Sequence, residues 1–152
     1  MIYTSKCVEE TQKIGYELAK KLYTGGYKNT VIAMRGEMGV GKTAFTLGFA
    51  SFFDIKGVKS PTYALMNQYS GKDIKIYHFD MYRISDEDDL YSIGYDDYAV
   101  SDGYKIIEWS ENIEYAIPTD AIYVTISRVP GNENAREIKI SCKEERYENS
   151  CI

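Results

Sequence analysis

The eight residues GEMGVGKT, from Gly36 to Thr43, have the types and spacing of a phosphate-binding loop. They match the pattern G-x-x-x-x-G-K-[ST], in which glycines let successive backbone N–H groups point at phosphate oxygens. In such a loop Lys42 reaches the β- and γ-phosphates, and the Thr43 hydroxyl ligates Mg²⁺. The alternative is a chance glycine turn, which is disfavoured because an apolar strand pattern precedes the loop and a helical pattern follows it. The backbone and side-chain contacts predicted from the motif are Gly36, Gly39, Val40, Gly41, Lys42 and Thr43.

The loop predicts a nucleotide but only partly identifies it. No N-K-x-D element, which reads guanine, is present in the sequence, so ATP is favoured over GTP. A phosphate loop by itself does not separate a hydrolase from a phosphotransferase or from a module that senses ATP.

Two acidic residues at strand ends could complete a Mg²⁺ site. Asp80 ends the run IKIYHFD and Glu108 ends the run YKIIE. In an open α/β sheet, ligands bind at the carboxyl ends of the strands, and a phosphate-loop enzyme needs an acid for the metal or its waters. For each residue the alternative is a solvated carboxylate at a strand terminus.

His78 is the only histidine of the chain, and it lies two residues before Asp80. On a strand the two side chains share one face, so a contact between them is allowed. No Ser or Cys nucleophile motif accompanies the pair, and no Cys/His grouping indicates zinc. We therefore expect His78 to support Asp80 rather than to act as an acid or base.

Two further features leave alternatives open. Ser60-Pro61-Thr62 lies in a predicted loop, where its hydroxyls could reach the γ-phosphate or Mg²⁺ or could form an ordinary turn. Trp109, the sole tryptophan, either packs in the core or contacts a substrate or partner beside the site.

The elements that must position these residues follow from hydrophobic spacing. Cys7, Thr11, Ile14, Leu18 and Leu22 mark one face of a helix, which we expect Ser5 to cap and Gly25-Gly26 to end. Thr30 to Met34 is a continuous apolar run, typical of a strand covered on both faces. The segment 42–53 has helical spacing of phenylalanines.

The second half of the chain reads as strands and short helices. We expect a hairpin around residues 70–73, a short helix capped by Ser85, a strand at 104–109, a helical turn at 112–116 and a closing hairpin over 120–142. The predicted fold class is α/β and similar to phosphate-loop NTPases. It has a central, mostly parallel sheet flanked by helices, with antiparallel hairpins.

Length and composition favour one soluble domain. The 152 residues suit a single domain over 1–152, with 143–152 as a flexible tail. A net charge of −5 disfavours direct, tight binding of nucleic acid. The three cysteines lack metal-site spacing and suit reduced thiols, and no signal peptide or membrane span is visible, so a cytoplasmic location without membrane contact is predicted.

The segments GEMGVGKTAF, VKSPTYALMNQY, YHFDMYR and IIEWSE, in this order, resemble the TsaE (YjeE) family over nearly the whole chain. That family comprises small bacterial P-loop ATPases needed to make threonylcarbamoyladenosine in tRNA, the modification of adenosine 37. The resemblance implies ATP and Mg²⁺ as cofactors.

By motif, the resemblance makes Lys42 the phosphate lysine, Thr43 a Mg²⁺ ligand and Thr62 a loop threonine near the γ-phosphate. It implies that Asp80 takes the place of the Walker-B-like acid and Glu108 that of a second acid near Mg²⁺. The resemblance also places Thr11 and Arg136 close to the nucleotide and matches Trp109 to the family tryptophan. At Ala44, where the family often has a second threonine, the backbone N–H can still bind phosphate.

The resemblance further implies a complex with the tRNA threonylcarbamoyl transferase subunit and its companion subunit, with tRNA contacted only indirectly. Weak ATP turnover by the chain alone, raised by these partners, is the expected activity. The competing hypotheses are a small-molecule kinase and a nucleotide-sensing interaction module without hydrolysis. The kinase is disfavoured because its usual arginine-rich lid is not evident.

Overall fold

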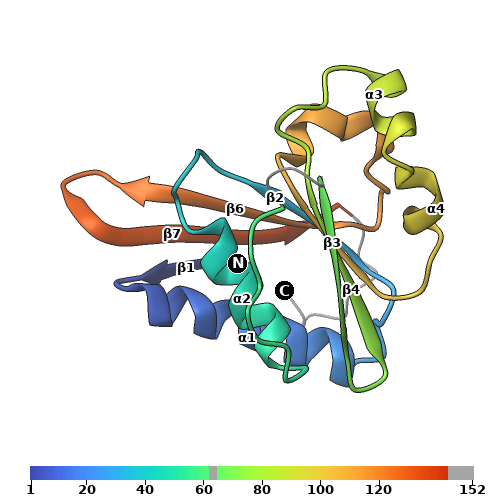
Figure 1. Cartoon of the computed structure of the whole chain (residues 1–152). Coiled ribbons are helices and arrows are strands. Elements are labelled where there is room, and N and C mark those ends of the chain that lie inside the picture. The colour runs from blue at the N-terminus through green and yellow to red at the C-terminus, as the bar shows by residue number, and fades with distance from the viewer. Residues whose placement is uncertain (62–64, 144–152) are drawn as a thin grey trace.

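A seven-stranded sheet forms the centre of the computed structural model, which describes residues 1–61 and 65–143 (Figure 1). The strands are β1 (Ile2–Ser5), β2 (Val31–Arg35), β3 (Met66–Gly71), β4 (Ile74–Asp80), β5 (Tyr104–Glu108), β6 (Ile122–Val129) and β7 (Asn132–Cys142). The helices are α1 (Val8–Thr24), α2 (Lys42–Ser51), α3 (Glu87–Ser92), α4 (Tyr95–Ala99) and the 3₁₀ helix η1 (Ser110–Ala116).

The strand order is β1-β7-β6-β2-β5-β4-β3. The four strands β6, β2, β5 and β4 are mutually parallel, whereas β3 on one side and β7 and β1 on the other are antiparallel to their neighbours. The α/β prediction is therefore confirmed, but "mostly parallel" holds only for the central strands, and the sheet as a whole is mixed.

Helices cover both faces of the sheet. On one face α1 and α2 pack against the strands through Leu18, Leu22, Phe45 and Phe49. On the other, a second apolar cluster joins the sheet to α3, α4 and η1 through Leu90, Tyr95 and Ile113. The strand β2 contributes alternate residues to the two clusters, which explains its continuous apolar sequence.

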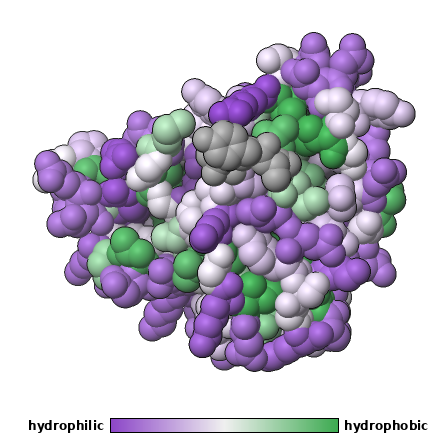
Figure 2. Space-filling model, in the orientation of Figure 1, coloured by the Kyte–Doolittle hydropathy of each residue, from purple (hydrophilic) through white to green (hydrophobic). Residues whose placement is uncertain are grey.

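The surface in the view of Figure 1 is divided between hydrophilic areas and separate hydrophobic patches (Figure 2). Among the described helices, none combines the length and apolar character that crossing a membrane requires.

Several predicted helix starts differ from the structure. Ser5 is not the cap of the first helix: it ends β1, a strand that was not predicted, and the residue before α1 is Cys7. Cys7 is exposed rather than part of the buried face. Ser85 is not the cap of α3 either, because Asp86 occupies that position and its Oδ1 accepts a hydrogen bond from the Asp89 N–H at 2.9 Å.

Other predicted elements agree closely with the structure. The hairpin β3–β4 turns at Lys72 and Asp73, and β6 and β7 form the closing hairpin predicted over 120–142. Helix α4 was not predicted. The tail predicted at 143–152 lies, apart from Lys143, outside the described residues.

Candidate functional site

The predicted phosphate loop lies between the end of β2 and the start of α2. Its three glycines have φ of 147° at Gly36, 74° at Gly39 and 121° at Gly41, in the left-handed half of conformational space that other residues rarely adopt. At Gly36 there is also no room for a side chain, because a Cβ would lie 2.6 Å from the Ile126 carbonyl oxygen. The motif glycines are therefore required by this loop conformation.

Helix α2 begins directly after Gly41, so that Lys42, Thr43 and Ala44 form its first turn. The backbone N–H groups of a first helical turn have no partner inside the helix and point out of its end. Together with the helix dipole, they attract anions. The loop and helix thus present a set of N–H donors on one side of a cavity.

Lys42 is almost completely buried, with 6% of its surface exposed. Its Nζ donates a hydrogen bond to the Gly36 carbonyl oxygen and lies 4.3 Å from the centre of the Trp109 ring. These two contacts hold the ammonium group at the loop, beside the cavity.

The two predicted acids meet at the carboxyl ends of adjacent parallel strands. Asp80 and Glu108 are direct register partners across β4 and β5. Asp80 is half-buried, and its Oδ1 accepts a hydrogen bond from the Tyr82 N–H at 3.0 Å. Burial raises the pKa of the Asp80 carboxyl above its ordinary value, and the nearby Glu108 adds to the rise, whereas the Tyr82 N–H and Lys42 oppose it.

Glu108 is only 3% exposed, so the alternative of a solvated carboxylate is wrong for this residue. Its Oε2 lies 3.1 Å from His78 Nε2 and 3.3 Å from Ser60 Oγ. The sequence predicts that His78 supports Asp80, but the structure pairs it with Glu108, which lies diagonally across on β5, two residues beyond Ile106, the register partner of His78.

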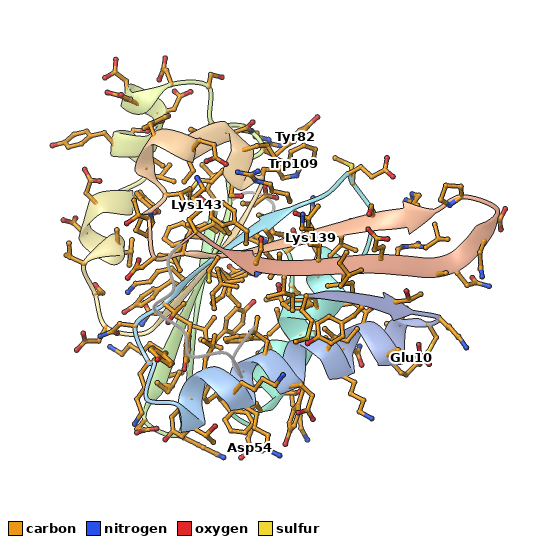
Figure 3. All side chains as sticks on the ribbon, turned by 180° about the vertical axis from the view of Figure 1, so that it is seen from behind. Glu10, Asp54, Tyr82, Trp109, Lys139 and Lys143 are labelled. Carbon is orange, nitrogen blue, oxygen red and sulfur yellow. The ribbon has the colours of Figure 1, made fainter. Side chains whose placement is uncertain are left out.

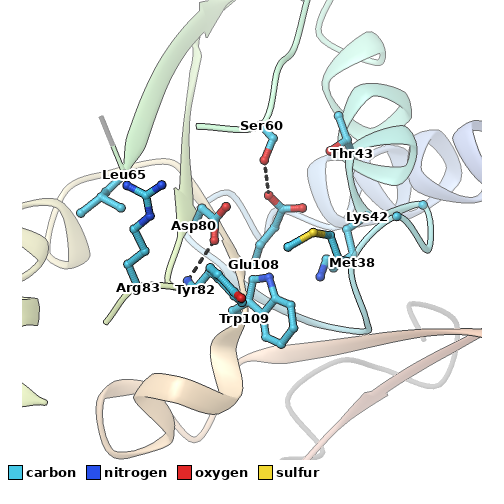
Figure 4. A pocket seen from close by; sticks show the side chains of 12 residues that line it. Met38, Lys42, Thr43, Ser60, Leu65, Asp80, Tyr82, Arg83, Glu108 and Trp109 are labelled. Carbon is cyan, nitrogen blue, oxygen red and sulfur yellow. Dashed lines mark hydrogen bonds between the residues drawn. The ribbon is translucent and has the colours of Figure 1, made fainter. Parts of the chain in front are cut away.

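A cavity of about 500 Å³ brings these residues together (Figure 4). The predicted site residues that line it are Gly39, Gly41, Lys42, Thr43, Asp80 and Glu108. Ser60 and Trp109, left open by the sequence, also line it, as do Met38, Leu65, Tyr82 and Arg83, which were not predicted as site residues. For Tyr82 and Arg83 a signal was available, because both follow Asp80 in the YHFDMYR segment.

Trp109 is not a simple core residue. Its ring is partly exposed and lies 5.0 Å from that of Tyr82, and Figure 3 shows the two side by side. Its backbone is left-handed, with φ of 56°, an unusual conformation for a bulky residue. The conformation turns the chain sharply from β5 into η1, and it places the ring over Lys42.

A second cavity, of about 430 Å³, lies on the other side of the loop. Four predicted nucleotide contacts line it, namely Thr11, Val40, Ala44 and Arg136, and Gly39 and Gly41 border both cavities. Arg136 Nε donates to the Val40 carbonyl oxygen at 2.8 Å, and Thr11 Oγ1 is hydrogen-bonded to Ser5 Oγ at 2.8 Å. Of the predicted site residues, only Thr62 lies outside the described residues.

The oxygen donors beside Lys42 suit Mg²⁺ better than a softer metal. They are the Thr43 hydroxyl and the Asp80 and Glu108 carboxylates. Within residues 1–61 and 65–143 there is no group of three or more His, Cys, Asp or Glu side chains that could enclose a metal. Such a sparse set fits Mg²⁺, which keeps several waters and takes other ligands from phosphates.

Comparison with known proteins shows which family the chain resembles over most of its length. Residues 5–138 match the family model described as threonylcarbamoyl adenosine biosynthesis protein TsaE. The tRNA threonylcarbamoyladenosine biosynthesis protein TsaE of Bacillus subtilis is 34% identical over 94% of this chain and 86% of its own length. The protein of the same name from Haemophilus influenzae is 37% identical over 82% of this chain and 76% of its own.

A solved structure, that of Bacillus subtilis YdiB, superposes with a TM-score of 0.78 at 27% identity, covering 97% of this chain and 88% of that one. The family model, the relatives and the solved structure thus each span most of the fold described above. The chain belongs to the TsaE family.

Proposed function

We propose that this protein is a Mg²⁺-dependent, P-loop ATPase that supports formation of threonylcarbamoyladenosine in tRNA. It would act in a complex with the tRNA threonylcarbamoyl transferase subunit and its companion subunit, without binding tRNA directly. Family membership supports a role in this pathway, since the matching family model and the relatives are both named for threonylcarbamoyladenosine biosynthesis. A fold similar to P-loop NTPases and a cytoplasmic location are part of the proposal.

The observation that carries the ATPase part is the position of the loop. A glycine loop with the required positive φ angles joins a central parallel strand to a helix, and two carboxylates end the neighbouring strands. This is the edge of an α/β sheet where ligands bind. A chance glycine turn would not explain why Lys42, Thr43, Asp80 and Glu108 line one cavity.

The two cavities suggest how ATP would lie. The triphosphate would occupy the first, with Lys42 exchanging the Gly36 carbonyl for phosphate oxygens and the amides of Lys42 to Ala44 binding further oxygens. The nucleoside would extend past Gly39 and Gly41 into the second, near Thr11 and Arg136. Thr62, outside the described residues, is proposed near the γ-phosphate because Ser60 already lines this cavity.

Mg²⁺ would be held by the Thr43 hydroxyl together with Glu108 or Asp80, and when bound it would neutralise charge on the phosphates. The proposed reaction is attack of water on the γ-phosphate, with Lys42 and the loop amides stabilising the charge that develops. One carboxylate would orient the water and the other would serve the metal. The Glu108 side chain is buried and hydrogen-bonded to both Ser60 and His78, whereas Asp80 is only half-buried. Glu108 is therefore the more rigidly held of the two carboxylates.

The experiment compares wild type with Lys42→Ala and Glu108→Ala. Lys42→Ala removes charge-assisted contacts to phosphate and should weaken ATP binding about 10- to 100-fold. Glu108→Ala should leave the ADP affinity measured without Mg²⁺ within about threefold while turnover falls about 100-fold or more. Isothermal titration calorimetry and phosphate release measure the two effects, and the exposed Lys20→Ala is the matched control.

The partner part needs a separate measurement. Turnover should rise when the transferase complex is added, and tRNA threonylcarbamoylation should fail with Glu108→Ala. Unchanged turnover on addition of the complex contradicts the proposal. A phosphorylated metabolite as product would favour a kinase, and intact cellular function with Lys42→Ala and Glu108→Ala would favour a sensor without hydrolysis.

A further inference from the structure

His78 is a fully buried polar side chain on β4, between β3 and β5. Its exposure is 0%, and it projects from β4 towards β5, where its Nε2 lies 3.1 Å from Glu108 Oε2. The Glu108 side chain is itself 4% exposed. A buried polar pair of this kind, at the base of a cavity, is costly unless its hydrogen bond is made, which ties the position of each side chain to the other.

The direction of this hydrogen bond follows from the chemistry of the pair. A carboxylate oxygen accepts, so Nε2 carries the hydrogen and donates it. The other ring nitrogen, Nδ1, is buried and has no hydrogen-bond partner in the described part of the chain. A hydrogen on Nδ1 would leave a buried donor unpaired, at a cost of about 1–3 kcal/mol, so the Nε2–H tautomer is favoured.

The hydrogen bond distinguishes the two oxygens of Glu108. In the described structure both hydrogen bonds to this carboxylate, from His78 and from Ser60, fall on Oε2. That leaves Oε1 for the cavity, which Glu108 lines together with Lys42 and Thr43 (Figure 4). Ser60 is half-buried and lies in a loop, whereas His78 is held in a central strand and so supplies the rigid contact.

We propose that His78 is a positioning residue that fixes Glu108 with Oε2 turned into the sheet and Oε1 turned towards Mg²⁺ or its waters. This inference rests on the proposed function, since it gives Glu108 a role at the metal. Partners that orient a metal-site carboxylate typically change metal affinity or activity by about 10- to 100-fold when removed.

The first test needs no nucleotide. Because the chain has a single histidine, the ¹⁵N-histidine NMR spectrum of the protein, with any affinity tag removed, reports one imidazole only. The expected spectrum shows hydrogen on Nε2, protected from exchange with solvent, and a large shift of this resonance in Glu108→Ala. Hydrogen on Nδ1, or a resonance unaffected by Glu108→Ala, overturns the inference.

The second test compares His78→Gln with His78→Asn. Both replace the ring by an amide, but only the glutamine N–H₂ group reaches the position of Nε2. The readouts are the ratio of ADP affinities with and without Mg²⁺, and turnover. His78→Gln should stay within about threefold of wild type, whereas His78→Asn should lose about 10-fold or more in both readouts, with metal-free ADP affinity unchanged.

Two outcomes contradict a positioning role. Either His78→Asn behaves like wild type, or both variants lose metal-free ADP affinity and thermal stability equally, as a merely structural role predicts. If Mg²⁺ does not raise the affinity of the wild-type protein for ADP, and the protein does not hydrolyse ATP, the proposed function fails. The NMR experiment then still decides whether His78 holds Glu108.

Discussion

At the scale of single residues, burial changes the chemistry of several side chains. Tyr95 is 2% exposed, packs edge-on against Phe79 and donates its hydroxyl to the Ala116 carbonyl oxygen at 3.4 Å. Burial raises the pKa of Tyr95 to about 12, with the nearby Asp96 adding to the rise. In the unfolded chain the pKa of tyrosine is about 10. The neutral phenol is therefore favoured by the folded state.

This shift predicts a specific alkaline instability. Because the folded-state pKa exceeds the unfolded value, the contribution of Tyr95 is complete below pH ~10 and is lost as the pH rises towards ~12. The loss should reach about 2–3 kcal/mol at most. Tyr95→Phe should therefore show a shallower fall in the free energy of unfolding between pH 9 and 11, measured by urea denaturation. Tyr91→Phe, at a position that is 77% exposed, is the control and should follow wild type. Equal slopes for all three proteins would contradict the prediction.

Much of the candidate site was predictable at this scale, because its chemistry is local in sequence. The loop motif identifies Lys42 and Thr43, and strand ends identify Asp80 and Glu108. The pairing of His78 with Glu108 was not predictable, since it depends on the register of β4 against β5, thirty residues apart along the chain. Thr62 stays a prediction.

At the scale of elements, the close crossing of α1 and α2 depends on two glycines. A Cβ at Gly48 would lie 1.9 Å from the Gln12 carbonyl oxygen, and one at Gly15 would lie 2.2 Å from that of Phe45. Both contacts involve backbone atoms, which no change of rotamer relieves. Glycine here allows the backbones of the two helices to touch.

Gly48→Ala should therefore destabilise the protein, although alanine is the better helix former by about 1 kcal/mol. The two helices would have to separate, and overpacking of this kind costs about 1–3 kcal/mol or more. Chemical denaturation measures the change, with Lys20→Ala on the exposed face of α1 expected within about 0.5 kcal/mol of wild type. A Gly48→Ala protein as stable as wild type would show that the crossing is looser than described.

The elements that were missed have weak sequence patterns. The four residues of β1 alternate poorly, and the strand exists because its backbone pairs with β7. Helix α4 has a single buried residue, Tyr95, so its sequence shows no hydrophobic periodicity from which a helix could be predicted. By contrast α1 and β2 were predicted from sequence, because each carries a long or continuous apolar pattern.

At the scale of the whole molecule, 23 acidic residues outnumber 18 basic ones. A chain of this charge lacks the excess of Lys and Arg that drives binding to phosphate backbones. We predict no binding of the isolated protein to unmodified tRNA at 150 mM salt in fluorescence anisotropy, and binding only when the transferase subunits are added. Salt-dependent, micromolar binding by the protein alone would contradict the proposal that tRNA is contacted indirectly.

The strand order has a consequence for synthesis of the chain. The central strand β2 carries the phosphate loop, yet its partners β5 and β6 begin only at Tyr104 and Ile122. On the ribosome, β2 and α2 emerge long before the strands that must pair with them, and such long-range pairing is slow. The glycine loop of the candidate site, although encoded in the first third of the chain, therefore meets Asp80 and Glu108 only late in translation. Until then an apolar strand is left exposed to chaperones or to aggregation.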